Sequence, residues 1–443
     1  MTVLAGASTA DITPGAGVPM VGYGLRVGVA EGRNDPLLVR TLAMTDEAGT
    51  TLAIAVCDLV GVPYGLVRQA RDLIATELEI PPDNVLVAAT HTHSGPMAVY
   101  DSSAYVETTA RAIAGSVRVA MRERAPVVLK VGSVEITTVS QNRRDPDGPI
   151  ERVARVLLAE RLDDQGGPAV ATLVNYACHS TVFEHDNLHW SADWPGAMAR
   201  SIERAVGGTA IYLQGAAGNI NPVWMRHDPN EVERVGGIVG TAAARVVHEL
   251  RPLDAGQWCI NLNWSEDVPA PPAAHGSLLE NVRFRAARTT LEMPARVRRP
   301  VDELHDELAD LVARIAAEPD VGARRAHIAR RNALTYELQL IAATRGRSVE
   351  RLELQAFRLA DGAAVSSLPG EFFVEIGDEL RARGGLAHHF IAGYANGAVG
   401  YVPTAEAFAH HGYEVGMARF APETAATVVD ASLSLLLCVG AEA

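Results

Sequence analysis

Two histidines separated by one residue stand where an apolar segment ends. His91 and His93 belong to AATHTHSGP at residues 88–96, in which a short β-branched run precedes them and Ser-Gly-Pro follows. Side chains at i and i+2 of an extended chain point to the same side, so the two imidazoles can converge beyond the strand. That arrangement suits a metal ion, or a metal ion together with a general acid/base. A pair of surface histidines is the alternative, which the buried strand and the tight turn disfavour.

A third histidine and a glutamate occupy comparable positions further along the chain. His179 ends an apolar strand in NYACHSTVF, which fixes its position better than those of His185 and His189 in the next loop. We therefore interpret His179 as a candidate ligand and the other two as loop residues. Glu371 follows a Pro-Gly turn in LPGEFFVEIG and opens a predicted helix. A carboxylate there either interacts with the helix dipole or supplies a third metal ligand, and the residue alone does not decide between them.

Three further segments carry polar side chains near predicted element ends. Asp193 enters a helix in SADWPG, where an aspartate can cap the first turn. Asn219 stands in QGAAGNINP, a loop of small residues in which the backbone can approach a ligand closely. We assign Asn219 and Asp193 to substrate binding. Tyr401 and Tyr413 lie in GYANGAVGYVPTAEAFAHHGYE, and tyrosines are usually packing residues with a hydrogen-bonded hydroxyl.

The elements that must position these residues alternate between strands and helices. Periodic apolar patterns predict helices over 64–80, 103–124, 194–206 and 231–250. Short apolar runs predict strands over 38–46, 51–59, 83–90, 126–136, 151–162, 169–178 and 210–215. A Pro-rich connector at 268–276 precedes two amphipathic helices within about residues 300–346. A hairpin over 352–370 and a closing strand over 427–437 complete the order.

This order predicts an α/β fold with mixed β-sheets flanked by helices. We expect residues 1–443 to form a single catalytic domain that includes the helical excursion at about 300–346. Hydrophobic residues make up 48% of the chain and charged residues 21%, which excludes disordered, collagen-like and disulfide-scaffold proteins. The four cysteines, Cys57, Cys178, Cys259 and Cys438, lie in apolar runs and are expected to be buried free thiols.

Charge and hydropathy restrict the partners. The net charge of −14 disfavours a nucleic-acid partner, and we interpret the Arg-rich stretch 283–299 as a solvated face or an ion-pair surface. The longest apolar runs, such as LSLLLCV, fall far short of the ~20 residues of a membrane helix, so no stable membrane insertion is expected. No secretory signal is visible, which predicts a cytoplasmic protein. We expect a small-molecule substrate and consider a homo-oligomer. The helical excursion is expected to pack on the body or to lie at a subunit contact.

Taken together, these segments resemble the neutral (non-lysosomal) ceramidase family, the zinc amidases that hydrolyse N-acyl sphingosine. The opening ADITPGAGVPMVGYG is similar to the first segment of that family, and ATHTHSGP is similar to its hallmark. NYACHS, SADWPG, QGAAGNINP, PGEF and YANGAVGYVPTAEAF…GYE follow in the family's order, so the resemblance covers about residues 5–415. It implies the catalytic fold of that family and a Zn²⁺ cofactor. The residues that match its zinc ligands are His91, His179, Glu371 and Tyr401.

The resemblance also implies a catalytic shell around the scissile carbonyl. Its matching residues are His93, Tyr413 and Arg143, the last in SQNRRDPDGP. Zinc activates water for attack on an amide at neutral pH. Arg143 and Tyr413 are suited to stabilise the oxyanion, and His93 is suited to act as general acid/base.

The sequence departs from the family in ways that bear on substrate. Larger members add a C-terminal immunoglobulin-like domain and a secretion signal, and neither is visible here. Ala217 and Asn219 stand where the family often has Asp or Ser. We therefore predict zinc-dependent hydrolysis of a small soluble N-acyl amide, with long-chain ceramide a poorer substrate. The alternatives are an esterase or lactonase on the same site, an amidohydrolase-superfamily barrel, and an inactive metal-stabilised binding protein.

Overall fold

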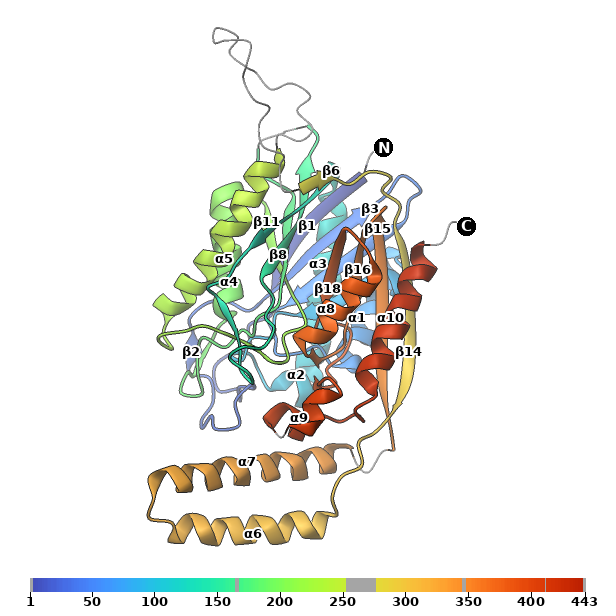
Figure 1. Ribbon diagram of the computed structural model, residues 1–443. Helices are drawn as coiled ribbons and strands as arrows, with labels where there is room; N and C mark the ends of the chain where they lie inside the picture. The colour runs from blue at the N-terminus through green and yellow to red at the C-terminus, as the bar shows by residue number, and fades with distance from the viewer. Residues whose placement is uncertain (1–2, 164–166, 252–275, 345–347, 411, 441–443) are drawn as a thin grey trace, which may run out of the picture.

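Two β-sheets form the middle of the molecule, and helices cover their outer sides (Figure 1). The computed structural model describes residues 3–163, 167–251, 276–344, 348–410 and 412–440. The predicted α/β class, with mixed sheets flanked by helices, is confirmed. A helical hairpin projects from one end of this body (Figure 1).

The larger sheet has nine strands in an open order. Along the sheet they are β11 (Thr209–Gln214), β9 (Ala171–Tyr176), β8 (Val153–Arg161), β6 (Ala125–Glu135), β1 (Val3–Asp11), β3 (Leu38–Thr45), β4 (Thr51–Cys57) and β5 (Val85–Ala89), with β13 (Gly276–Leu278) beside β6. β4 pairs with β5 and β9 with β11 in parallel, and the other neighbours are antiparallel. This order of the described strands contradicts the amidohydrolase barrel, which requires eight parallel strands.

A four-stranded sheet packs face to face on the larger one. Its order is β14 (Arg285–Pro294), β15 (Val349–Ala360), β16 (Ala363–Ser367) and β18 (His388–Ala392). β15 and β16 form the antiparallel hairpin predicted over 352–370. Leu42 and Ile54 of the large sheet share one buried cluster with Phe357 and Phe390 of the small sheet.

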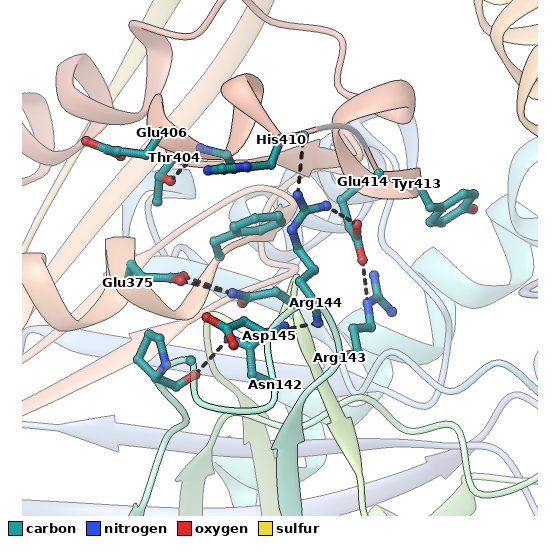
Figure 2. A pocket seen from close by; sticks show the side chains of 16 residues that line it. Asn142, Arg143, Arg144, Asp145, Glu375, Thr404, Glu406, His410, Tyr413 and Glu414 are labelled. Carbon is teal, nitrogen blue, oxygen red and sulfur yellow. Dashed lines mark hydrogen bonds and ion pairs between the residues drawn. The ribbon is translucent and has the colours of Figure 1, made fainter.

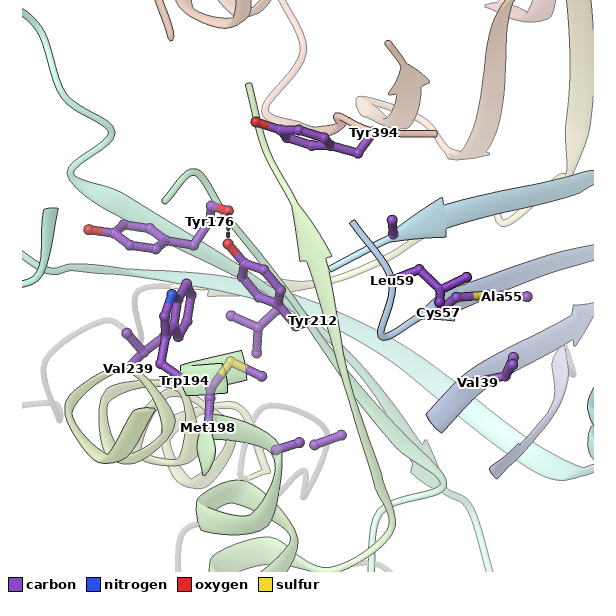
Figure 3. Close-up of a cluster of buried hydrophobic side chains, with 14 of the residues drawn as sticks. Val39, Ala55, Cys57, Leu59, Tyr176, Trp194, Met198, Tyr212, Val239 and Tyr394 are labelled. Atoms are coloured by element: carbon purple, nitrogen blue, oxygen red, sulfur yellow. Dashed lines mark hydrogen bonds between the residues drawn. The ribbon is translucent and has the colours of Figure 1, made fainter. Parts of the chain in front are cut away.

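Four helices cover the other face of the large sheet. They are α1 (Tyr64–Leu78), α3 (Ser103–Arg122), α4 (Asp193–Val206) and α5 (Pro229–Leu250). Figure 3 shows part of the buried cluster under them, in which Trp194 of α4 meets Tyr212 of β11 edge to face with ring centroids 4.7 Å apart. Because both faces of the large sheet are covered, strands such as β5 (VLVAA) are apolar throughout and show no alternation.

The outer face of the small sheet carries α8 (Val374–Gly384) and α10 (Thr424–Gly440). The prediction of a closing strand over 427–437 is wrong, because this segment lies within α10. Its buried positions recur every three or four residues, at Val428, Ser432, Leu435 and Val439. The run TVVDASLSLLL mixes apolar residues with Asp430, Ser432 and Ser434, so it does not distinguish a strand from a helix, and packing against the sheet selected the helix.

The expected burial of the cysteines holds for two of them. Cys57 and Cys178 are buried, whereas Cys438 is exposed on α10. Cys259 and residues 268–275 of the predicted connector lie outside the described residues. No helix within the described ranges is both long and apolar enough to cross a bilayer.

The projecting hairpin consists of α6 (Val301–Ala317) and α7 (Val321–Thr344), which confirms the predicted helical excursion. Leu304, Leu311 and Leu334 form its small apolar core. In the Arg-rich stretch before it, Arg298 forms an ion pair with Glu337 of α7 at 3.3 Å. The hairpin is thus tied to the body, while the assignment of residues 1–443 to one domain stays a prediction.

Asp58, directly after β4, provides a test of how burial affects stability. Its carboxylate accepts a hydrogen bond from the Leu38 N–H at 2.9 Å, and burial raises its pKa to about 6. Between about pH 4 and 6 the folded protein keeps a proton that the unfolded chain has released, so this group contributes less stability as pH rises. We expect the free energy of unfolding of Asp58→Asn to exceed that of wild type by up to about 3 kcal/mol at pH 7.5. Below pH 4 the two values should differ little.

Urea unfolding of both proteins across this pH range checks the prediction about Asp58. Other titrating groups cancel in the difference between wild type and variant. A stability difference that does not change with pH would contradict it.

Candidate active site

His91 and His93 follow β5 in a turn. The backbone of His91 has a φ of 63°, in the left-handed region. Its Nδ1 lies 2.6 Å from the carbonyl oxygen of Val60. The Nε2 atoms of His91 and His93 are 3.1 Å apart. The two imidazoles therefore converge as the spacing predicts, but a turn brings them together and strand alternation does not.

His179 reaches the same point from the end of β9. Its side chain is fully buried, and its Nδ1 lies 3.0 Å from the carbonyl oxygen of Ile220 in β12 (Ile220–Pro222). A ring nitrogen beside a carbonyl oxygen carries the hydrogen, which leaves Nε2 with a free lone pair. The same reasoning applies to His91, whose ring centroid is 4.6 Å from that of His179. Both residues thus present Nε2 as a ligand atom.

Glu371 adds an oxygen to these two nitrogens. It lies in β17 (Glu371–Phe372), which pairs in parallel with β19 (Tyr401–Val402). Its Oε2 is 3.5 Å from His91 Nε2 and 3.4 Å from His179 Nε2. This buried oxygen has no hydrogen-bond partner among the described residues, although buried acceptors nearly always have one. Nitrogen and oxygen donors that converge around an unsatisfied carboxylate fit a divalent cation such as zinc.

The electrostatics of the site also suit a metal ion. Burial lowers the pKa of His93 well below its usual value, and the neighbouring histidines lower it further. Burial, with Arg143 nearby, lowers the pKa of His179 to about 4. Burial alone would raise the pKa of Glu371, but His91 and His179 outweigh it and hold that pKa well below the usual range. Neutral imidazoles and an ionised carboxylate are the forms that bind metals. The ligand atoms of His91, His93 and His179 all lie within 4.8 Å of one another, so His93 is also within reach of such an ion.

Arg143 supplies a positive charge beside the histidines. It follows β7 (Ser140–Asn142), and one of its amino groups lies 3.5 Å from His179 Nε2. The other donates to the Tyr401 hydroxyl at 3.0 Å, and Nε donates to Glu414 at 2.7 Å. Burial opposes the charge of Arg143, but Tyr401 and Glu414 outweigh it and raise the pKa above its usual value. The guanidinium is therefore a permanent cation.

His93 opens into a pocket of about 380 Å³. His93, Arg143 and Tyr401 line it, as does Tyr413, the first residue of α9 (Tyr413–Met417). The Tyr413 side chain is half exposed, and its ring centroid is 5.7 Å from that of Tyr401 and 6.2 Å from that of Tyr336 on α7. The helical hairpin thus forms part of the pocket wall, which the sequence did not indicate.

The segment MVGYG contributes residues that sequence reasoning missed. The Tyr23 ring packs edge-on against His93, with centroids 5.0 Å apart. Gly22 has a φ of 113°, and a Cβ there would come 2.6 Å from the His93 Cβ. A Cβ at Gly24 would collide with the Tyr336 hydroxyl. Both glycines therefore permit close approach, and the Gly-Tyr-Gly spacing is the signal that could have identified this wall.

Two other residues that contribute to the site had no clear signal in the sequence. The Tyr394 ring is buried 4.0 Å, centroid to centroid, from the ring of His91. Glu414 accepts from Arg143 at 2.7 Å and from Arg144 at 2.6 Å. Both residues hold functional side chains in place and come from segments far away along the chain.

Asp193, assigned to substrate binding, requires correction. Its side chain is buried, and its carboxylate accepts from the backbone N–H groups of Val182, Phe183 and Trp194 at 3.2, 3.0 and 2.7 Å. These bonds fold the carboxylate back onto its own loop, so it holds the chain after His179 and does not face the pocket. The conformation of that loop, which the sequence does not reveal, decides where the Asp193 side chain points.

Asn219 also lies away from the histidines. Its Oδ1 accepts from the Val374 N–H at 2.9 Å, and its Nδ2 donates to Glu375 at 2.9 Å. It lines a second, larger pocket of about 860 Å³, drawn in Figure 2, whose wall shares Arg143 and Tyr413 with the first. Because His93 lines the smaller pocket and does not line this second one, the chemistry is assigned to the smaller pocket.

Comparisons with known proteins identify the family of this chain and similar folds. The sequence profile described as "neutral/alkaline non-lysosomal ceramidase, N-terminal" matches residues 3–265. The fold is similar to that of the neutral ceramidase from Pseudomonas aeruginosa, with a TM-score of 0.71, 21% identity, and coverage of 99% of this chain and 74% of that one. A ceramidase complexed with C2 gives a TM-score of 0.73 at 20% identity, with coverage of 99% and 75%. A search of curated proteins gives no match. Since the profile spans more than half of the sequence, the chain belongs to the neutral/alkaline non-lysosomal ceramidase family.

Proposed function

We propose that this protein is a zinc-dependent hydrolase that cleaves the amide bond of an N-acyl substrate. Membership of the family supports a hydrolase acting on amide bonds. The observation that carries the proposal is the convergence of His91 Nε2 and His179 Nε2 on the unsatisfied Glu371 Oε2, at 3.5 and 3.4 Å. In this proposal Tyr401 is the fourth ligand.

The other side chains of the pocket have the remaining catalytic roles in this proposal. Bound zinc acts as a Lewis acid that polarises a carbonyl group and activates water. His93, whose pKa burial lowers well below its usual value, accepts a proton and later donates it to the leaving amine. Arg143 and the Tyr413 hydroxyl stabilise the negative charge that develops on the carbonyl oxygen.

Arg143 and Arg144 offer a matched pair of variants. Both bind Glu414, but only Arg143 also lies next to His179 and Tyr401. We expect Arg143→Ala to retain zinc and to lower kcat roughly 10²–10³-fold, as the loss of one oxyanion donor does. Arg144→Ala should change kcat little. Equal kcat values in the two variants, measured beside zinc content, would contradict a catalytic part for Arg143.

The substrate is proposed to be small and water-soluble. The pocket volume of about 380 Å³ lies at the low end for ligand sites, which are about 300–1,000 Å³. Among the described residues that line it, Leu25 is the one aliphatic side chain, and polar and aromatic groups dominate. A long alkyl chain would gain little from such walls.

A substrate panel tests both the bond and the size. We expect kcat/KM for short N-acyl amides to exceed that for the matching esters and lactones, and to exceed that for long-chain ceramide in mixed micelles. A preference for the esters would favour the esterase alternative, and a preference for ceramide would contradict the size argument. Zinc content without turnover of any compound would favour a binding protein. The cytoplasmic location and a homo-oligomer stay predictions.

A further inference from the structure

We propose that the outer part of the catalytic pocket binds a positively charged amine, which the side chain of Glu184 recognises. The inference rests on the proposed function, because the amine would belong to the N-acyl substrate. Glu184 lies in the loop between β9 and β10 (His189–Trp190) and lines the same pocket as His93 and Arg143. Its side chain is 43% exposed, so a ligand can reach it.

The loop that carries Glu184 is held in place relative to His93. One Arg26 amino group donates to the Glu184 carbonyl oxygen at 3.2 Å, and the other donates to the His93 carbonyl oxygen at 2.9 Å. The Tyr23 hydroxyl donates to the Phe183 carbonyl oxygen at 2.6 Å, while its ring packs on His93. These contacts fix the distance from the proposed acid/base to the segment that bears the carboxylate.

No permanent cation within the described part of the chain forms an ion pair with Glu184. Its ion-pair partners there are His185 Nδ1 at 3.6 Å and His227 Nε2 at 3.9 Å. The His227 Nδ1 lies 2.8 Å from the Val182 carbonyl oxygen and so carries a hydrogen. The distances from His185 and His227 to the Glu184 carboxylate, 3.6 and 3.9 Å, are both longer than a hydrogen bond. The carboxylate therefore retains its capacity for a cationic ligand.

The remaining wall of the pocket also suits a cation. Arg143, the guanidinium in the lining, is already paired with Glu414 at 2.7 Å. Aromatic side chains face the same space, among them Tyr23, Trp224 and Tyr336. The faces of aromatic rings attract ammonium groups. A carboxylate among aromatic rings is the combination that binds a protonated amine, and the net charge of −14 favours its approach.

The substrate class that follows is a mono-N-acylated diamine. Its amide would lie at His93 and its ammonium group at Glu184, with a short alkyl spacer between the two. Loss of the acyl group would release a carboxylic acid and a diamine.

A pair of ligands and a pair of variants test this inference. The ligands are N-acetyl-1,4-diaminobutane and N-pentylacetamide, which differ by an ammonium group in place of a methyl group. The variants are Glu184→Gln and Asp186→Asn, and Asp186 lies in the same loop but is not among the described pocket-lining residues. Titration calorimetry on the zinc-loaded protein, at constant ionic strength, measures affinity without requiring turnover.

We expect wild type and Asp186→Asn to bind the ammonium compound about tenfold more tightly than the neutral one, and Glu184→Gln to bind both alike. Equal affinities in wild type, or a preference that survives Glu184→Gln, would overturn the inference. Hydrolysis is followed in parallel. Binding preference without hydrolysis would count against the proposed function alone, whereas hydrolysis of both compounds without preference would count against the inference alone.

Discussion

Replacing His179 with alanine is expected to give a folded protein that neither retains zinc nor hydrolyses an amide. The His179 Nε2 is one of two imidazole nitrogens that converge on the Glu371 oxygen, and metal affinity depends on the number of ligands already in position. We expect zinc affinity to fall by more than about 100-fold, because removal of a partner outside the ligand set already costs about 10–100-fold. Activity should fall with zinc occupancy.

His389 provides the matched control for this experiment. It is also a buried histidine, but it lies in β18, where Ser366 is its hydrogen-bond partner at 2.8 Å. His389→Ala removes the same volume from the interior without touching the site, so it should lower stability and leave zinc content unchanged. Metal analysis of both purified variants checks this, and full zinc occupancy in His179→Ala would show that the ligand assignment is wrong.

Removing the charge of Glu160 is expected to destabilise the protein by about 3–5 kcal/mol, the cost of breaking a buried ion pair. The single lysine of the sequence, Lys130 in β6, is fully buried, and its ammonium group donates to Glu160 of β8 at 2.7 Å. Arg251 approaches the other carboxylate oxygen of Glu160 at 3.2 Å. Glu160→Gln would therefore leave two cations facing a neutral amide inside the sheet.

A double-mutant cycle distinguishes the ion pair from simple packing. Replacing Lys130 with methionine alongside Glu160→Gln removes the buried ammonium as well as the carboxylate, so the double variant should recover much of the lost stability. Chemical unfolding of wild type, both single variants and the double variant measures the coupling. If the stability losses of the two single variants simply add in the double variant, the ion-pair interpretation is contradicted.

The ends of the strands and the spacing of the motifs could be predicted from the sequence. The strands that precede His91 and His179 could be predicted because they are short apolar runs, and both end within a few residues of the expected positions. Such local patterns depend on neighbours along the chain, which a sequence contains. The pattern at 427–437 failed for the same reason, since a short run in which apolar and polar residues follow one another irregularly does not distinguish a strand from helix α10.

The tertiary structure alone decided which side chains meet. The pairing of β17 with β19 places Glu371 beside Tyr401, and Arg143 reaches both Glu414 and His179 from a third part of the chain. Whether a polar side chain points into a pocket or back onto its own loop depends on such non-local contacts, which is why Asp193 was misassigned. The placement of Tyr336 over Gly24 likewise arises from packing of the helical hairpin, because no local pattern in the sequence relates the two segments.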